Sequence, residues 1–165
     1  MKKLLLAAII SLSTVSTAAL AEIKVGIILG FTGPIESLTP AMRDGARLAF
    51  LEASNSGNLL DGETFTIVEG DSTCTDSAAA TAAAEQLVAD GVVAIMGADC
   101  SGVTKAINAS VAVPNGILMV SPSATSPALS KVPDSGTFWR TAPSDAKGGQ
   151  ILADIALDRG LTSVA

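Results

Sequence analysis

The chain contains no histidine and no tyrosine, and only two cysteines among its 165 residues. Histidine is the commonest general base and metal ligand near neutral pH, and two cysteines cannot complete a four-ligand zinc site by themselves. The composition therefore argues against metal binding and against catalysis that a histidine activates. We expect no metal ion and no cofactor.

Basic residues are scarce as well, since 10 Lys and Arg stand against 16 Asp and Glu. Neutralising phosphates requires clustered Lys and Arg, so the sequence argues against nucleic acid as a partner. Hydrophobic residues make up 48% of the chain and charged residues 16%, which excludes a disordered chain or a coiled coil. The length corresponds to one domain of roughly 150 residues.

Residues 1–21 have the pattern of a secretory signal. Lys2 and Lys3 precede the apolar run Leu4–Ile10, and the segment ends in Ala19-Leu20-Ala21, a small-residue cleavage site. The apolar run is far shorter than the roughly 20 residues that a membrane-spanning helix requires. We therefore expect cleavage after Ala21 and a mature protein that begins at Glu22.

Export changes the interpretation of Cys74 and Cys100. An oxidising compartment lets a thiol pair persist as a disulfide, so we expect a bridge, with two unpaired buried thiols as the alternative. In the chain-entropy model a bridge closing a loop of this length stabilises a domain by about 3.5 kcal/mol.

Apolar runs alternate with helical patterns along the mature chain. Such alternation, with strands too apolar to show a period of two, predicts a doubly wound α/β fold: a parallel sheet with helices on both faces. Thr39 and Ser144 are candidate N-caps of the first and last helices. The expected strands are 23–29, 63–69, 92–96 and 117–120, and the expected helices are 39–56, 76–90, 102–111 and 144–158.

Two further segments carry organisational information. Residues 121–143 contain four prolines and many serines, so we expect a long loop or a short broken connection there, and loops of this length are usually functional. Residues 161–165 have the pattern of a strand that is beginning. We therefore treat the chain as the truncated first part of a larger protein.

Ligands of open parallel sheets bind at the carboxyl ends of the strands, which here are followed by residues 30–38, 97–104 and 121–125. Glycines 26, 30 and 33 do not have the spacing of a dinucleotide-binding turn. Gly97 and Gly102 match the outer glycines of a phosphate loop, but Val103 and Thr104 follow where Lys and then Ser or Thr are required. The sequence thus argues against a nucleotide site.

A hydrolase site is also disfavoured, because the chain has no glycine-serine elbow and no histidine to activate a serine. A catalytic base outside this chain would leave an exported hydrolase as an alternative.

The remaining interpretation is recognition of a small zwitterion. Ser101, beside Gly102 at the start of a predicted helix, could bind a carboxylate through its hydroxyl and nearby N–H groups. Thr125 could add its N–H to the carboxylate and accept from an ammonium through its hydroxyl, and Ser123 could add its carbonyl. The structural alternatives are an N-cap for Ser101 and an ordinary loop hydroxyl for Thr125.

The mature stretch resembles the first part of the periplasmic leucine/isoleucine/valine-binding proteins, the amino-acid receptors of ABC importers with the type I binding-protein fold. The matching segments are IKVGIILGFTGP (23–34), RDGARLAF (43–50), DSTCTDSAAATAAAEQLVADGVVAIMGADCS (71–101), GILMVSPSATSPAL (116–129) and FWRTAPSD (138–145). They occur in the family's order and span nearly all of residues 22–165.

The resemblance implies a role for each matching residue. It implies a disulfide between Cys74 and Cys100, and a ligand carboxylate held by Ser101 and Thr125. The Thr125 hydroxyl and the Ser123 carbonyl would take the ammonium, with Ala124 between them as part of the site. The family often has a tyrosine where this chain has Leu38, so Leu38 is a candidate pocket residue and the preferred amino acid is in question.

The resemblance also implies how the whole protein works. Residues 22–165 would form the N-terminal lobe of a periplasmic receptor, and a second lobe would supply an acidic ammonium partner and much of the pocket. The two lobes would close on a branched-chain or similar aliphatic amino acid and deliver it to an ABC permease in the inner membrane. We expect a monomer without enzymatic activity. The alternative is the sensing lobe of a signalling receptor for amino acids, small amides or urea.

Overall fold

The computed structural model of the chain describes residues 22–59 and 62–163. The signal sequence expected for residues 1–21 and its cleavage site lie outside the described residues. None of the helices in the described part has the length and apolarity needed to cross a membrane.

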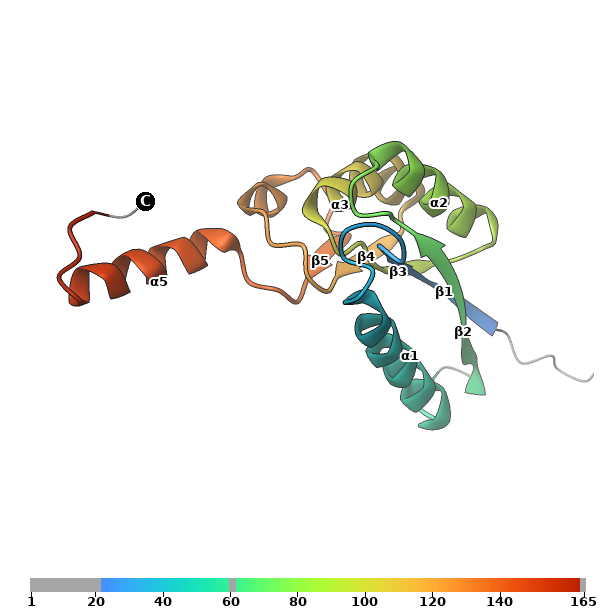
Figure 1. The fold of residues 1–165 in the computed structure, drawn as a ribbon. Helices are drawn as coiled ribbons and strands as arrows, with labels where there is room; N and C mark the ends of the chain where they lie inside the picture. The colour runs from blue at the N-terminus through green and yellow to red at the C-terminus, as the bar shows by residue number, and fades with distance from the viewer. Residues whose placement is uncertain (1–21, 60–61, 164–165) are drawn as a thin grey trace, which may run out of the picture.

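Five parallel strands form one sheet in the order β2-β1-β3-β4-β5 (Figure 1). The strand order reverses at β1, because the chain moves from β1 to β2 on one side and then crosses to β3 on the other. In open parallel sheets such a reversal opens a crevice at the carboxyl ends of the strands. The strands are β1 (Glu22–Leu29), β2 (Thr64–Asp71), β3 (Ala94–Gly97), β4 (Leu118–Ser121) and β5 (Phe138–Arg140).

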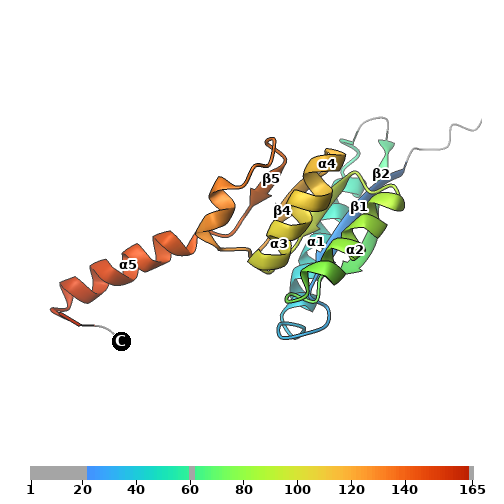
Figure 2. The ribbon, with the colours of Figure 1, turned by 90° about the horizontal axis from the view of Figure 1, so that it is seen from above.

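Helices cover both faces of the sheet, which confirms the predicted doubly wound fold. Helix α1 lies on one face, and α2, α3 and α4 lie on the other (Figures 1 and 2). A π-helical turn, η2, joins α3 to α4, and a 3-10 helix, η3, follows β4. The helices are α1 (Thr39–Asn55), α2 (Ser77–Ala89), α3 (Ser101–Ile107), η2 (Asn108–Ala112), α4 (Val113–Asn115), η3 (Pro127–Lys131) and α5 (Asp145–Asp158).

The last helix, α5, runs away from the sheet (Figures 1 and 2). Its N-cap is Ser144, as expected, whose side chain accepts from the N–H of Ala146 at 3.4 Å. Gly160 follows the helix with φ +72°, a left-handed conformation that glycine adopts without steric cost.

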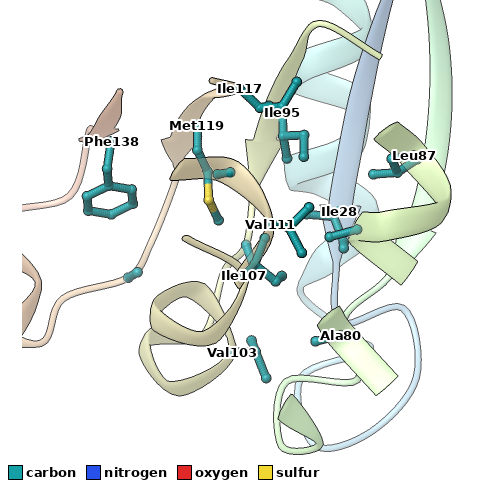
Figure 3. Close-up of a cluster of buried hydrophobic side chains, with 14 of the residues drawn as sticks. Ile28, Ala80, Leu87, Ile95, Val103, Ile107, Val111, Ile117, Met119 and Phe138 are labelled. Carbon is teal, nitrogen blue, oxygen red and sulfur yellow. The ribbon is translucent and has the colours of Figure 1, made fainter. Parts of the chain in front are cut away.

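The core lies between the sheet and helices α2 and α3 (Figure 3). Five consecutive residues of β1, Val25–Leu29, are buried, as expected for a strand with both faces covered. Each large apolar side chain in such a core contributes about 1.5–3 kcal/mol. The labelled core side chains are Ile28, Ala80, Leu87, Ile95, Val103, Ile107, Val111, Ile117, Met119 and Phe138.

Thr39 does not cap α1, so that prediction is wrong. Leu38 occupies the N-cap position without a side-chain bond, and Thr39 is the first helical residue and fully buried. Its hydroxyl donates to the carbonyls of Gly30 at 3.3 Å and Glu36 at 3.2 Å. The buried hydroxyl therefore ties α1 to the end of β1, because a buried polar group requires a partner.

The segment 121–143 is more regular than the sequence suggests, since it contains both η3 and the fifth strand, β5. Strand β5 is only three residues long and is defined by its pairing with β4, with Met119 opposite Phe138 and Ser121 opposite Arg140. Residues 161–163 have no regular structure, so no strand begins at 161. The rest of the expected strand, residues 164–165, lies outside the described residues.

Candidate functional site

The candidate site lies where β3 and β4 end, and it consists of Ser101 and the loop residues Ser123, Ala124 and Thr125. Helix α3 begins at Ser101, four residues after the last residue of β3, and the loop follows β4 directly. The N–H of Ser126 donates to Oγ of Ser101 at 3.0 Å. This bond joins the two segments, so the groups that the sequence assigns to one ligand lie side by side.

Ser101 is free of the helix-capping role that was its structural alternative. Cys100 occupies the N-cap position and makes no side-chain capping bond, and Ser101 is the first helical residue. The Ser101 hydroxyl oxygen instead accepts from Ser126. A hydroxyl that accepts one bond still has its proton to donate, and the residue is half-buried, so solvent reaches it.

Two of the three polar groups of Thr125 bond the same residue, Asp145. Its hydroxyl donates to Oδ2 of Asp145 at 2.9 Å, and its carbonyl accepts from the N–H of Asp145 at 3.0 Å. The hydroxyl oxygen keeps lone pairs that can accept from another donor. No hydrogen bond among the described residues engages the Thr125 N–H.

Asp145 is a residue that sequence reasoning missed. It lies in the expected helix 144–158 and ends the matching segment FWRTAPSD. Its position at the start of α5 and its two bonds to Thr125 place a carboxylate at the edge of the candidate site. The signal available in the sequence was this acidic residue within a matched segment.

The Ser123 hydroxyl proton and the Ala124 N–H already have partners within this part of the chain. The Ser123 hydroxyl donates to the carbonyl of Asp99 at 3.0 Å. Ala124 is fully buried, and its N–H donates to Oγ of Ser121 at 3.0 Å. The Ser121 hydroxyl in turn donates to the carbonyl of Ala98, so the end of β4 is tied to the end of β3.

Asp99 is a second residue that the sequence analysis missed. It is 3% exposed, and its carboxylate accepts from the N–H of Gly30 at 2.7 Å, the hydroxyl of Ser72 at 3.1 Å and the N–H of Cys100 at 2.9 Å. Buried carboxylates require such partners. Asp99 therefore binds the ends of β1, β2 and β3 together beneath the site. An acidic residue two positions after an apolar strand was the available signal.

The disulfide between Cys74 and Cys100 is present, with the two Cα atoms 5.2 Å apart, and this prediction is confirmed. Cys74 lies in the loop before α2, and Cys100 directly precedes Ser101. The bridge thus anchors the start of α3, and with it Ser101, to the loop between β2 and α2.

Leu38 lies in the loop between β1 and α1, with 57% of its surface exposed. No hydrogen bond within the described part of the chain joins it to Ser101 or to Thr125. Its side chain is available for contact, and its role as a pocket residue stays a prediction.

Asp71, at the end of β2, fixes the same loop. Its carboxylate accepts from the Thr32 hydroxyl at 2.6 Å and from the N–H groups of Thr32 at 3.3 Å and Thr73 at 2.8 Å. Partial burial raises the pKa of Asp71, but hydrogen bonds from Thr32, Thr73 and Phe31 outweigh it and hold the pKa below its ordinary value. Asp71 therefore stays ionised and holds the first turn in place.

Residues 22–59 and 62–163 define the chemical groups that this part of the chain brings to the site. No group of three or more His, Cys, Asp and Glu gathers there to hold a metal ion. The Ser101 hydroxyl has one hydrogen bond in this part of the chain, which it accepts from a backbone N–H, and no carboxylate there accepts its proton. The groups that converge on the site are hydroxyls, backbone amides and one carboxylate.

Comparisons with known proteins show the family to which the chain is related. A family model described as periplasmic binding protein matches residues 22–165. The Leu/Ile/Val-binding protein homolog 3 of Brucella melitensis is 31% identical over 142 residues, covering 86% of this chain and 38% of that protein. The leucine-specific-binding protein of Salmonella typhimurium is 31% identical over 156 residues, covering 94% of this chain and 41% of that protein.

A solved structure has the same fold. The branched-chain amino acid transporter substrate-binding protein LivJ of Streptococcus pneumoniae, in complex with isoleucine, superposes with a TM-score of 0.68 at 29% identity. The match covers 76% of this chain and 35% of that one. The chain therefore spans about two fifths of the length of the curated relatives that it matches.

Proposed function

The chain belongs to the periplasmic binding protein family, and from this premise we propose that it forms part of an exported receptor that captures a branched-chain or similar aliphatic amino acid for an ABC importer. The relatives named above are binding proteins and not enzymes. The observation that carries the proposal is the bond from Ser126 to Ser101. It brings Ser101 and Thr125 together at the carboxyl ends of β3 and β4.

The carboxylate of the amino acid is received by uncharged donors. The Ser101 hydroxyl accepts from Ser126 and can donate its proton to the ligand, and the Thr125 N–H has no partner among the described residues. Backbone and hydroxyl donors of this kind bind carboxylates well once water is excluded, because the effective dielectric falls.

The ammonium is received on the other side of Thr125. The Thr125 hydroxyl oxygen and the Ser123 carbonyl supply lone pairs. Asp145 supplies a negative charge, since its Oδ2 lies 2.9 Å from Oγ1 of Thr125. An ammonium beside Thr125 would thus meet an acidic group of this chain in addition to any that a second lobe contributes.

The architecture of the relatives motivates a two-lobed receptor. Residues 22–165 are proposed to supply the N-terminal lobe, and the remaining three fifths of the relatives' length corresponds to a second lobe. Closure about a hinge is the motion known for periplasmic binding proteins as a class. The receptor would act as a monomer in the periplasm after cleavage at Ala21, and would deliver its ligand to a permease in the inner membrane.

Leu38 is the proposed contact for the ligand's side chain from this lobe. An exposed aliphatic residue offers apolar surface without a polar group to satisfy. With Leu38 at the position where the family often has a tyrosine, this side of the proposed pocket would be aliphatic, which would suit leucine, isoleucine or valine.

A binding panel on the full-length protein tests the proposal. Thermal unfolding and calorimetric titration are measured with leucine, isoleucine, valine, short amides and urea, and with leucinamide and 4-methylpentanoate as leucine analogues that lack one charged end. We expect a thermal shift with at least one branched-chain amino acid and weaker binding of both analogues. No shift with any compound would overturn the receptor proposal. A shift with urea or amides alone would favour a sensor for those solutes.

A further inference from the structure

Arg140 lies at the end of β5, opposite Ser121, and its guanidinium reaches across the candidate site's loop. Its Nη1 donates to the carbonyls of Ala124 at 3.1 Å and Ser126 at 2.9 Å. Its Nη2 donates to Oγ of Ser130 at 2.7 Å. The ion pairs of the described residues are Arg43 with Asp44 and Arg47 with Glu69. The charge of Arg140 is therefore directed at neutral oxygens of one loop.

The bond to the Ala124 carbonyl has a strict geometric consequence for Thr125. The Ala124 carbonyl and the Thr125 N–H belong to the same peptide unit, which is planar and trans, so they point in opposite directions. A guanidinium that holds the carbonyl on one side of the loop therefore aims the Thr125 N–H at the other side.

The neighbouring peptide units are held independently of Arg140 or carry no N–H. The unit between Thr125 and Ser126 is bonded at both ends, because Asp145 donates to its carbonyl and its N–H donates to Ser101. The next unit ends in Pro127, which has no N–H to donate. The Ala124–Thr125 unit is thus the one whose N–H is open and whose carbonyl depends on Arg140.

We infer that Arg140 is a positioning residue for the ligand's carboxylate, which it never touches. It fixes the plane of the Ala124–Thr125 peptide and polarises it, because a charged donor on the carbonyl strengthens the N–H at the opposite end. This inference rests on the proposed function, since it concerns the donor assigned to the amino acid's carboxylate.

The test compares ligands that differ only at the carboxyl end, in the full-length protein. Leucine and leucinamide share the ammonium and side chain, but only leucine carries the charged carboxylate. Arg140→Gln is titrated with both, because glutamine is uncharged and too short to bridge two carbonyls. Arg140→Lys keeps the charge without the fork, and Ser130→Ala removes only the third bond. Arg43→Gln, on α1 and away from the loop, is the matched control.

For Arg140→Gln we expect the dissociation constant for leucine to rise about tenfold or more, because the hydrogen bond from the Thr125 N–H to the charged carboxylate is lost. The dissociation constant for leucinamide, which has no carboxylate, should rise less than about threefold. Arg140→Lys should recover part of the lost affinity for leucine. Ser130→Ala should raise the dissociation constant for leucine only about two- to threefold. Arg43→Gln should bind leucine as the wild type does. Melting temperatures of each variant identify folded protein. If Arg140→Gln does not fold, Arg140→Lys and Ser130→Ala carry the comparison.

The outcomes separate this inference from the function that it rests on. If the wild type binds leucine but the Arg140 variants bind it equally well, the positioning role is wrong. If leucine and leucinamide lose affinity in equal proportion, Arg140 only holds the loop together, and the inference is again overturned. If the wild type binds no amino acid at all, the proposed function fails and this role fails with it.

Discussion

Thr125 combines the polar groups that an amino acid's two charged ends require. Its carbonyl and hydroxyl are both bonded to Asp145, while its N–H is open in the described structure. The hydroxyl proton is used by Asp145, so the oxygen faces an incoming ammonium with lone pairs only. One residue can thus serve a carboxylate through its backbone and an ammonium through its side chain.

Thr125→Val should weaken leucine binding far more than it affects folding. Valine keeps the shape and the backbone N–H but removes the hydroxyl, and hydrogen bonds to charged groups contribute about 1.5–3 kcal/mol. We expect a rise of about ten- to hundredfold in the dissociation constant, measured by calorimetry on the full-length protein.

Ser123→Ala provides the contrast at the same loop. The proposed contribution of Ser123 is its carbonyl, which alanine retains, while the lost hydroxyl bond to Asp99 costs about 1 kcal/mol of stability. Binding should therefore stay close to that of the wild type. An unchanged dissociation constant in Thr125→Val would remove its hydroxyl from the site.

At the scale of elements, the close approach of β3 to β1 sets the position of the site's edge. Gly97, the last residue of β3, has φ +135°, and a Cβ there would collide with the carbonyl oxygen of Ile28 and lie 2.7 Å from its Cγ2. Only glycine fits this approach. Asp99 and Ser101 follow within four residues of Gly97, so the close approach of the two strands fixes the point from which the chain leads to both residues.

Gly97→Ala should destabilise the fold by at least about 2 kcal/mol, because it adds overpacking to an unfavourable φ. Gly45→Ala is the matched control: it lies in α1 with nothing within 4 Å of an added Cβ, so alanine should stabilise that helix by up to about 1 kcal/mol. Urea unfolding of both variants measures the difference. Equal midpoints would contradict the close approach of β3 to β1.

At the scale of the whole molecule, helix α5 has no buried residue, whereas the core lies between the sheet and helices α2 and α3. Leu152 and Leu157 on α5 are 68% and 71% exposed. A hollow of about 690 Å³ runs along this helix, lined by residues of α5 and of the segment that follows it. Neither Ser101 nor Thr125 is among the residues that line it.

Residues 22–163 alone should bind leucine at least about tenfold more weakly than the full-length protein, because one lobe supplies only one wall of the site and cannot exclude water. Calorimetric titration of the two proteins side by side measures this. Circular dichroism confirms that the shorter protein is folded. Equal affinities would contradict the two-lobed arrangement.

The sequence predicted the order of the main helices and strands and the parallel sheet, because apolar periodicity and helix-ending glycines are local patterns. It also predicted the disulfide, because the export signal implies an oxidising compartment. Ser101 and Thr125 could be singled out from the sequence because they follow two predicted strands, and parallel strands bring their carboxyl ends to one edge of the sheet. Strand β5 could not be predicted, because three residues carry no period and only pairing with β4 defines them.

The tertiary structure alone decided which polar groups meet. Thr39 resembles a cap in sequence, but burial turns its hydroxyl toward Gly30. The bonds of Asp99 to Gly30, of Arg140 to Ala124 and of Asp145 to Thr125 join residues 16 to 69 positions apart. Residue type and spacing determine which groups are available, whereas the partner of a buried or directed polar group depends on chain segments that only folding brings together.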